Sequence, residues 1–116
     1  MTDSTKASVR METGEPRYAV AHVTGRLDAA GVVAVEPAIT RAVASHERLA
    51  LDLAEVPYLA SMGLRLLMAA ARTLEKRGGR LVVVNPTSEV EAVLAIAGLE
   101  KPLRVCSGGA LAKAFG

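Results

Sequence analysis

Residues 51–67 decide the fold, and they read LDLAEVPYLASMGLRLL. The leucines at the start of this stretch alternate with other residues, which is the period-two pattern of a β-strand. The strand pattern ends near Val56, and a short turn then leads to Ser61. Beyond Ser61 the apolar residues recur every three or four positions, as they do along one face of a helix. The stretch therefore predicts a strand, a tight turn and a helix that begins just after a serine.

Ser61 is the strongest candidate for a functional residue. Serine is a preferred N-cap, so we expect its side chain to cap the helix. The start of a helix presents unpaired backbone N–H groups and the positive end of the macrodipole, so a phosphate on Ser61 would be stabilised there. Two interpretations stay open at this point: the serine is only a cap, or it is a phosphorylation switch.

The N-terminal part of the chain predicts a β-hairpin. Residues 1–6 are small and polar and are expected to be frayed. Strands are expected at 7–13 and 18–24, joined by a turn at 14–16. Alternation in the second strand places Ala19, Ala21 and Val23 on one face and Tyr18, Val20 and His22 on the other.

Helices and further strands alternate after the hairpin. Asp28 is expected to cap a helix over 29–45, whose regular part begins near Val35 because Pro37 interrupts the pattern. A third strand follows, with Leu49, Leu51 and Leu53 on one face. The remaining expected elements are a strand at 81–84, a helix opened by a capping box at 88–91, a strand at 103–106 and a short helix at 109–115. This order predicts an α/β fold with a mixed sheet of four to five strands and about four helices packed on it.

The helix after Ser61 is amphipathic. Its expected core stripe consists of Leu64, Leu67, Met68, Ala71 and Leu74. Arg65, Arg72 and Lys76 lie on the opposite line, either as a solvated face or as a docking strip for an acidic partner. The helix that opens at 88 is expected to turn Val90, Val93, Leu94 and Ala97 inward.

Length and composition favour one domain over residues 1–116, since 116 residues with 51% hydrophobic content can bury one core but not two. The net charge of +2 and the three aromatic residues argue against a nucleic-acid partner.

The single cysteine, Cys106, cannot form an intramolecular disulfide, and the first residues lack the apolar segment of a signal peptide. No apolar run reaches the length of a membrane span. We therefore expect a soluble, cytoplasmic protein without membrane insertion.

The sequence does not predict catalysis. His22 and His46 with one cysteine do not form a metal-ligand pattern, and the paired glycines at 78–79 and 108–109 do not extend to a nucleotide-binding fingerprint. Ser61 has no histidine near it in the sequence, so no serine triad can be assembled. We expect a binding protein without a cofactor or a metal, and not an enzyme.

The candidate site gathers at one edge of the predicted sheet. Open sheets bind ligands at the carboxyl ends of their strands, so Asp28, Ser61 and Asn85 are expected to be neighbours there. Around Ser61, Tyr58, Leu59 and Met62 either turn into the core or form an apolar patch that a partner covers, with Met62 the most exposed. Asp28 is either a helix cap or a group that tunes the charge beside Ser61.

Several segments together resemble the STAS domain of bacterial anti-sigma factor antagonists. They are Gly25-Arg26-Leu27-Asp28, the strand that ends near Val56, Tyr58 to Leu64, Gly79 to Pro86, and Gly98-Leu99. The resemblance covers about residues 9–115. In that family the turn usually reads Asp-Ser-Ser-Gly, and here the same four places hold Ala60, Ser61, Met62 and Gly63.

The resemblance implies a partner-switching regulator. The unmodified protein would bind an anti-sigma factor that is also a serine kinase, phosphorylation of Ser61 by that kinase would break the complex, and a phosphatase would restore it. The partner-binding residues implied are Asp28, Tyr58, Leu59, Ala60, Met62, Gly63, Arg65 and Asn85. Ala60 and Met62 replace the usual acid and second serine, which bears on how a kinase would orient the hydroxyl.

Alternatives remain. Members of the family also serve as accessory subunits of lipid-transport ATPases or as parts of stress-signalling scaffolds without a phosphorylation cycle. A small-molecule sensor is a third class, although the sequence offers no dense polar cluster for one. The oligomeric state is open, and a homodimer is among the possibilities.

Overall fold

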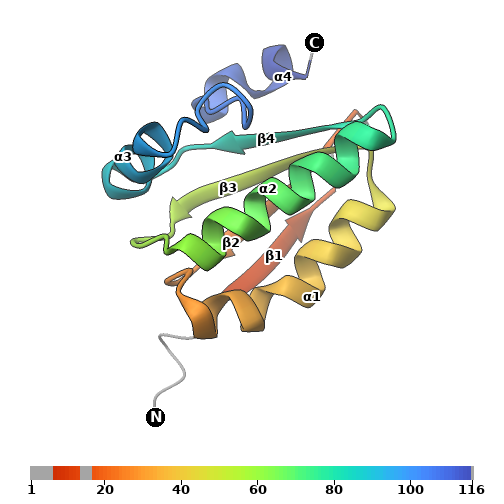
Figure 1. Ribbon diagram of the computed structural model, residues 1–116. Helices are drawn as coiled ribbons and strands as arrows, with labels where there is room; N and C mark the ends of the chain where they lie inside the picture. Colours follow the sequence, from red (N-terminus) through yellow and green to blue (C-terminus); the bar gives the residue numbers. More distant parts are fainter. Residues whose placement is uncertain (1–6, 14–16, 116) are drawn as a thin grey trace.

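The computed structural model describes residues 7–13 and 17–115 of the chain. The expected frayed residues 1–6 and the expected turn at 14–16 lie outside these ranges. One sheet has the strand order β1-β2-β3-β4 (Figure 1), and its strands are β1 (Ser8–Glu12), β2 (Ala19–Thr24), β3 (Arg48–Glu55) and β4 (Arg80–Val84). β1 pairs with β2 in the antiparallel direction, and the other two pairs are parallel. The sheet is therefore mixed, with the predicted hairpin at one edge.

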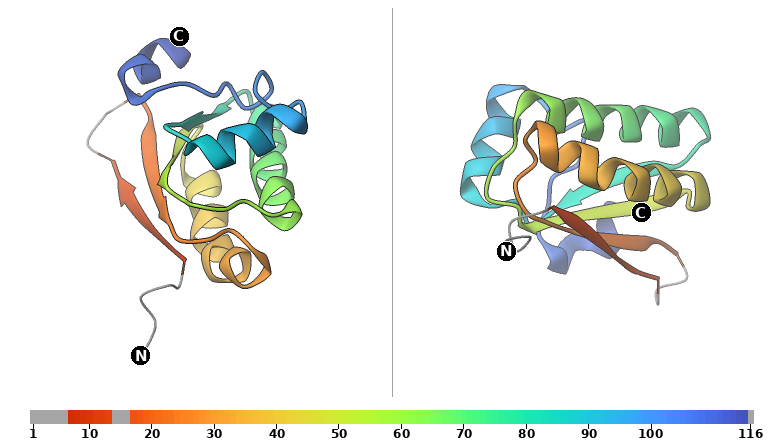
Figure 2. Two further views of the ribbon diagram at one scale, coloured as in Figure 1. Left: turned by 90° about the vertical axis from the view of Figure 1, so that its left-hand side faces the viewer. Right: turned by 90° about the horizontal axis from the view of Figure 1, so that it is seen from below.

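Helices cover both faces of the sheet. The two long helices, α1 (Ala29–Ser45) and α2 (Ser61–Lys76), connect parallel strands and lie side by side on one face (Figure 1). α3 (Ser88–Ile96) follows β4. Figure 2 shows the C-terminal segment, with η2 (Gly108–Ala110) and α4 (Leu111–Ala114), on the opposite face. Within the described residues, no helix combines the length and the apolar character that crossing a membrane requires.

Each face of the sheet buries its own apolar cluster. The β2 residues in the larger cluster, under α1 and α2, are Ala19, Ala21 and Val23. Val20 points to the other face and packs with Leu111 and Phe115. Tyr18 stacks on Phe115 with the ring centroids 4.9 Å apart. The predicted alternation of β2 is confirmed, and it is required because helices pack on both faces.

α1 runs without a break from Ala29 to Ser45 and includes Pro37. The prediction that its regular part begins near Val35 is therefore wrong. Pro37 is exposed, so water can satisfy the carbonyl that its missing N–H leaves without a helical partner. Val35 and Ile39, on the buried side, pack into the core and hold the helix together across the proline.

α2 buries a stripe that is shifted toward α1 relative to the prediction. Its buried residues are Gly63, Leu67, Ala70, Ala71 and Leu74. Leu64 and Met68, which were predicted in the stripe, are only half-buried. α1 and α2 pack against each other as well as on the sheet. The contact between the two helices covers Ala70.

α3 is capped by Thr87 and not by the predicted Ser88. The Thr87 hydroxyl accepts a hydrogen bond from the Val90 N–H at 3.3 Å, which makes Ser88 the first helical residue. Thr87 also donates to the carbonyl of Val56 at 3.0 Å and so ties the start of α3 to the end of β3. Val90 and Leu94 are buried as predicted, Val93 is half-buried, and Ala97 is exposed at the C-cap.

The C-terminal elements are shorter than predicted. The expected strand at 103–106 is reduced to one parallel bridge between Val84 and Cys106. Turns occupy the preceding residues, where Arg104 has a φ of 47°. The expected helix at 109–115 is divided into η2 and α4. Over residues 7–13 and 17–115 the sheet thus has four strands, at the lower end of the predicted range.

Gly31, in the first turn of α1, lets the helix backbone lie close to the carbonyl oxygen of Arg26 in the preceding loop. A Cβ at this position would collide with the carbonyl oxygen of Arg26. We expect Gly31→Ala to lower the free energy of unfolding by about 1–3 kcal/mol, because the backbone of the loop must shift. Urea denaturation measures this change. Gly109→Ala is the control, since nothing lies within 4 Å of its Cβ, and it should stay within about 0.5 kcal/mol of wild type. Equal stability of the two variants would contradict the interpretation.

Candidate functional site

The candidate site is built from two loops that continue the parallel pairing of β2 and β3. Leu27 N–H donates to the Tyr58 carbonyl at 2.9 Å, and Ala60 N–H donates to the Leu27 carbonyl at 3.0 Å. Leu27 and Leu59 form a parallel bridge between the loops. This pairing places the start of α1, with Asp28, directly beside the start of α2, with Ser61. The predicted juxtaposition of these two residues is confirmed.

Ser61 is exposed and is the first residue of α2. The N-cap is Ala60, whose side chain makes no capping hydrogen bond, so the prediction that Ser61 caps the helix is wrong. The boundary lies one residue earlier because the Ala60 carbonyl already accepts from Leu64 N–H at 3.0 Å. The first turn of α2 also carries no acidic residue. An anionic group on Ser61 would therefore meet a helix N-terminus that no side chain caps.

Asp28 is the N-cap of α1. Its Oδ1 accepts a hydrogen bond from Gly31 N–H at 2.9 Å. This bond, and to a lesser degree the neighbouring Arg26, hold the pKa of the Asp28 carboxyl below its usual value, whereas partial burial acts in the opposite direction. Asp28 is thus an ionised cap beside the Ser61 turn, which joins the two roles that the sequence left open.

Arg26 is a site residue that sequence reasoning missed. Its Nε lies 3.5 Å from Asp28 Oδ2, and its guanidinium carbon lies 4.4 Å from the centroid of the Tyr58 ring. The side chain therefore links the loop before α1 to the loop before α2 through an ion pair and a cation–π contact. The signal that could have found it was its place in Gly25-Arg26-Leu27-Asp28, one of the segments that carry the family resemblance.

Two residues predicted to contact a partner are buried. Leu59 is only 3% exposed, and Gly63 is buried beneath it. A Cβ on Gly63 would lie 2.5 Å from Leu59 Cδ1 and 3.0 Å from the Leu27 carbonyl oxygen. We correct their role from partner contact to support of the turn, because their packing lets α2 begin close to Leu27.

The exposed part of the turn combines apolar and charged side chains. Tyr58 and Met62 are 41% and 43% exposed, as the patch interpretation of these two residues requires. Arg65, one helical turn after Ser61, is also exposed. An aromatic ring, a thioether and a cation within four residues of Ser61 are thus accessible.

Asn85 lies at the same edge of the sheet but does not join this surface through its side chain. It has a φ of 54°, and its Oδ1 accepts from Gly108 N–H at 2.8 Å, so the amide binds the C-terminal segment. The partner-binding role of Asn85 stays a prediction, because the residue is exposed although its amide oxygen is engaged.

A second polar cluster lies on the sheet face opposite α1 and α2. His22 Nε2 is 2.7 Å from Glu12 Oε1, and His22 Nδ1 is 3.1 Å from Asp52 Oδ2. These residues line a cavity of about 370 Å³ that extends to Asn85. Within the described residues, no group of three or more histidine, cysteine, aspartate or glutamate side chains is arranged to hold a metal ion.

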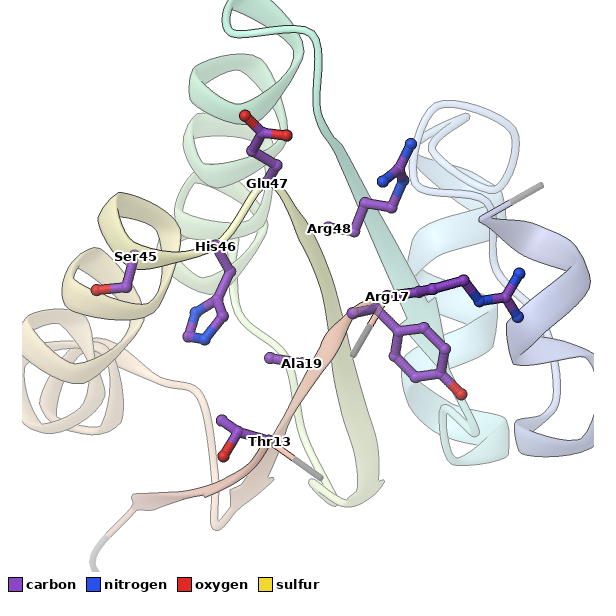
Figure 3. A pocket seen from close by; sticks show the side chains of 8 residues that line it. Thr13, Arg17, Ala19, Ser45, His46, Glu47 and Arg48 are labelled. Atoms are coloured by element: carbon purple, nitrogen blue, oxygen red, sulfur yellow. The ribbon is translucent and has the colours of Figure 1, made fainter. Parts of the chain in front are cut away.

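Another cavity, of about 380 Å³, lies at the end of α1 and the start of β3. It is shown in Figure 3, where the side chains of Glu47 and Arg48 point away from Thr13 instead of converging on one point.

The thiol of Cys106 is half-buried outside this cavity, and burial raises its pKa. A thiol of this kind is protonated at neutral pH and is a poor nucleophile.

The family described as "Mlab, STAS domain" matches residues 12–106, and the chain belongs to this family. No curated protein matches the chain.

Solved structures with the same fold include anti-sigma factor antagonists. The crystal structure of an anti-sigma factor antagonist from Mycobacterium paratuberculosis has 26% identity and a TM-score of 0.85, over 99% of this chain and 98% of that chain. The antagonist SpoIIAA in its unphosphorylated form has 22% identity and a TM-score of 0.69, over 86% and 87%. The phosphorylated form of SpoIIAA, a Bacillus cell fate determinant, also has 22% identity, with a TM-score of 0.67 over 86% and 90%.

A domain of a transporter is similar as well. The STAS domain of a SulP transporter from Vibrio cholerae has 23% identity and a TM-score of 0.65, over 88% of this chain and 84% of that chain. The fold thus occurs both in antagonists and in a transporter domain.

The lowered pKa of Asp28 predicts a pH dependence of stability. A carboxyl whose folded pKa is depressed stabilises the fold above its unfolded pKa of about 3.8, and this contribution is lost as the pH falls through the folded pKa. Asp28→Asn keeps a capping oxygen but does not titrate. We expect wild type to have the higher melting temperature at pH 6, and the difference to shrink as the pH is lowered below about 3.8. A difference that stays constant down to pH 2 would contradict this assignment.

Proposed function

We propose that this STAS domain is an anti-sigma factor antagonist that is switched by phosphorylation of Ser61. The observation that carries the proposal is the position of Ser61: it is exposed, at an uncapped helix N-terminus, on a turn with apolar side chains around it. The similarity to anti-sigma factor antagonists supports the partner class. The existence of SpoIIAA in a phosphorylated form supports a modification in a relative of this fold.

The unmodified turn offers the features of a binding surface. Tyr58 and Met62 give apolar area that a partner can cover, and Arg26 adds a cation held over the tyrosine ring. Binding the anti-sigma factor here would release a sigma factor. The domain acts by binding, and the only chemistry in the cycle belongs to the partner kinase and to a phosphatase.

Phosphorylation would reverse this binding. The Ser61 Oγ would attack the γ-phosphorus of ATP on the kinase, ADP would leave, and the hydroxyl proton would pass to a base of the kinase. The phosphate adds about −1.5 to −2 charges to the centre of the surface, close to the ionised Asp28. In the free protein, the N-terminus of α2 stabilises this charge, whereas in the complex the phosphate must be desolvated. A loss of ~3 kcal/mol in binding is more than a hundredfold in affinity.

A second candidate function is a STAS subunit of a lipid-transport ATPase or of a stress-signalling scaffold without a phosphorylation cycle. The observation that favours it is the turn itself, in which Ala60 and Met62 replace the acid and the second serine of the usual family turn. The similarity to the STAS domain of a SulP transporter is compatible with such a role. The same exposed surface would then dock a protein permanently.

The phosphorylation test uses an anti-sigma factor kinase that binds the unmodified domain. Incubation with the cognate kinase and ATP should add one phosphate to wild type and none to Ser61→Ala, which should still bind the kinase. Ser88→Ala is the matched control, because Ser88 is also exposed and is also the first residue of a helix. Mass spectrometry that places the phosphate on Ser88 or Ser107 would refute the assignment.

The binding test uses Ser61→Asp. An acid at the start of α2 should leave the domain unchanged or more stable by about 0.3–1 kcal/mol, because it favours the helix dipole. The same charge should weaken kinase binding, which calorimetric titration measures. If Ser61→Asp binds as tightly as wild type, the phosphorylation switch is excluded and the second candidate function takes its place.

A further inference from the structure

An apolar groove lies between α1 and α2 on the side of the helices away from the sheet. It has a volume of about 220 Å³, and its apolar lining includes Ile39, Val43, Leu66, Ala69 and Ala70. The two helices run side by side along it in Figure 1. At the far end, the Arg77 guanidinium donates to the carbonyls of Val43 and His46 at 2.7 and 3.0 Å, which joins the C-terminal ends of the helices.

The walls of the groove extend to the Ser61 turn. Met62 lies four residues before Leu66 and therefore on the same face of α2. Val33 lies three residues before Glu36 and on the same face of α1. Met62 is 43% and Val33 is 68% exposed, although both are large apolar residues. The groove thus opens, with two uncovered apolar side chains, at the end of the molecule where Ser61 lies.

One rim of the groove is basic. Ala69 has Arg65 four residues before it and Arg72 three residues after it, and Lys76 follows Arg72 by four residues, so the three cations form a row along the same face of α2. All three are exposed. Among the described residues, none of these cations pairs with a carboxylate. An unpaired basic row beside an apolar groove is complementary to an amphipathic segment with an acidic edge.

We propose that the groove binds an amphipathic helix of the anti-sigma factor, with its apolar face between α1 and α2 and acidic residues along the α2 rim. This inference rests on the proposed function, and it adds a second contact region that begins at Met62 and leads away from Ser61. The Ser61 turn then supplies the switch, and the groove supplies much of the affinity that the switch must overcome.

The test measures affinity for the same anti-sigma factor kinase with two kinds of variant. Ala69→Arg fills the groove, and the triple variant Arg65→Glu, Arg72→Glu, Lys76→Glu reverses the rim. Each should weaken binding about tenfold or more. The rim effect should shrink as salt is raised from 50 to 500 mM, because exposed charges are screened, whereas the groove effect should persist.

Matched controls carry the same changes outside the groove. Ala95→Arg places the same side chain on an exposed position of α3. Lys101→Glu, Arg104→Glu, Lys113→Glu makes the same change in net charge with exposed residues of the C-terminal segment. Both controls should bind within about twofold of wild type, a factor that corresponds to less than half a kcal/mol.

The outcomes separate this proposal from the proposed function. If Ser61→Asp weakens binding while the groove and rim variants bind as wild type, the groove proposal is overturned and the function stands. If the groove and rim variants weaken binding but Ser61→Asp does not, the groove is supported and the phosphorylation switch is lost. Absence of any binding by wild type would overturn both. Sedimentation that shows a dimer which Ala69→Arg dissociates would identify a second copy of the chain as the occupant and overturn the partner helix.

Discussion

The backbone pairing between the loops that follow β2 and β3 is the constraint on which the rest of the site depends. Its two hydrogen bonds, at Leu27 and Ala60, extend the parallel ladder beyond the ends of both strands. Because α1 and α2 start immediately after this pairing, their N-termini must lie side by side at one edge of the sheet. A switch residue on one helix and a capping carboxylate on the other are neighbours for this reason alone.

The same pairing sorts the side chains of the turn into buried and exposed sets. Leu27 and Leu59 point into the core, and Gly63 leaves room for them beneath the first turn of α2. Tyr58 and Met62, on either side, remain exposed. The apolar residues that hold the turn are thus distinct from those that a partner can touch. Changes at the first set should act on stability, and changes at the second set on recognition.

Much of this arrangement follows from the sequence. The alternation in β2 predicts which residues face each layer, since a strand buried on both faces must supply apolar side chains to both. The change from strand periodicity to helix periodicity within residues 51–67 predicts where Ser61 lies. The continuity of α1 through Pro37 was not predictable from local preference, because burial of Val35 and Ile39 outweighs the lost hydrogen bond. The N-cap was predicted at Ser61 and lies at Ala60, because backbone geometry and not side-chain type decides where a helix begins to within one residue.

The sequence predicted which loops meet at the edge of the sheet, but not the individual side-chain contacts between them. Nothing local indicates that Arg26 stacks on Tyr58, or that Asn85 binds Gly108. Within the turn, the prediction that Met62 is the most exposed apolar residue is confirmed, since Met62 is 43% and Leu59 is 3% exposed. The topology of the sheet decides these cases by bringing the loops together.

Mapping the partner surface residue by residue shows whether the two paired loops form it. Amide chemical shifts of the isotope-labelled protein would be followed by NMR as unlabelled anti-sigma factor kinase is added. We expect the largest changes at the site residues of the two paired loops, which are Arg26, Tyr58, Ser61 and Met62. Changes confined to the opposite face of the sheet, around His22 and α4, would contradict it.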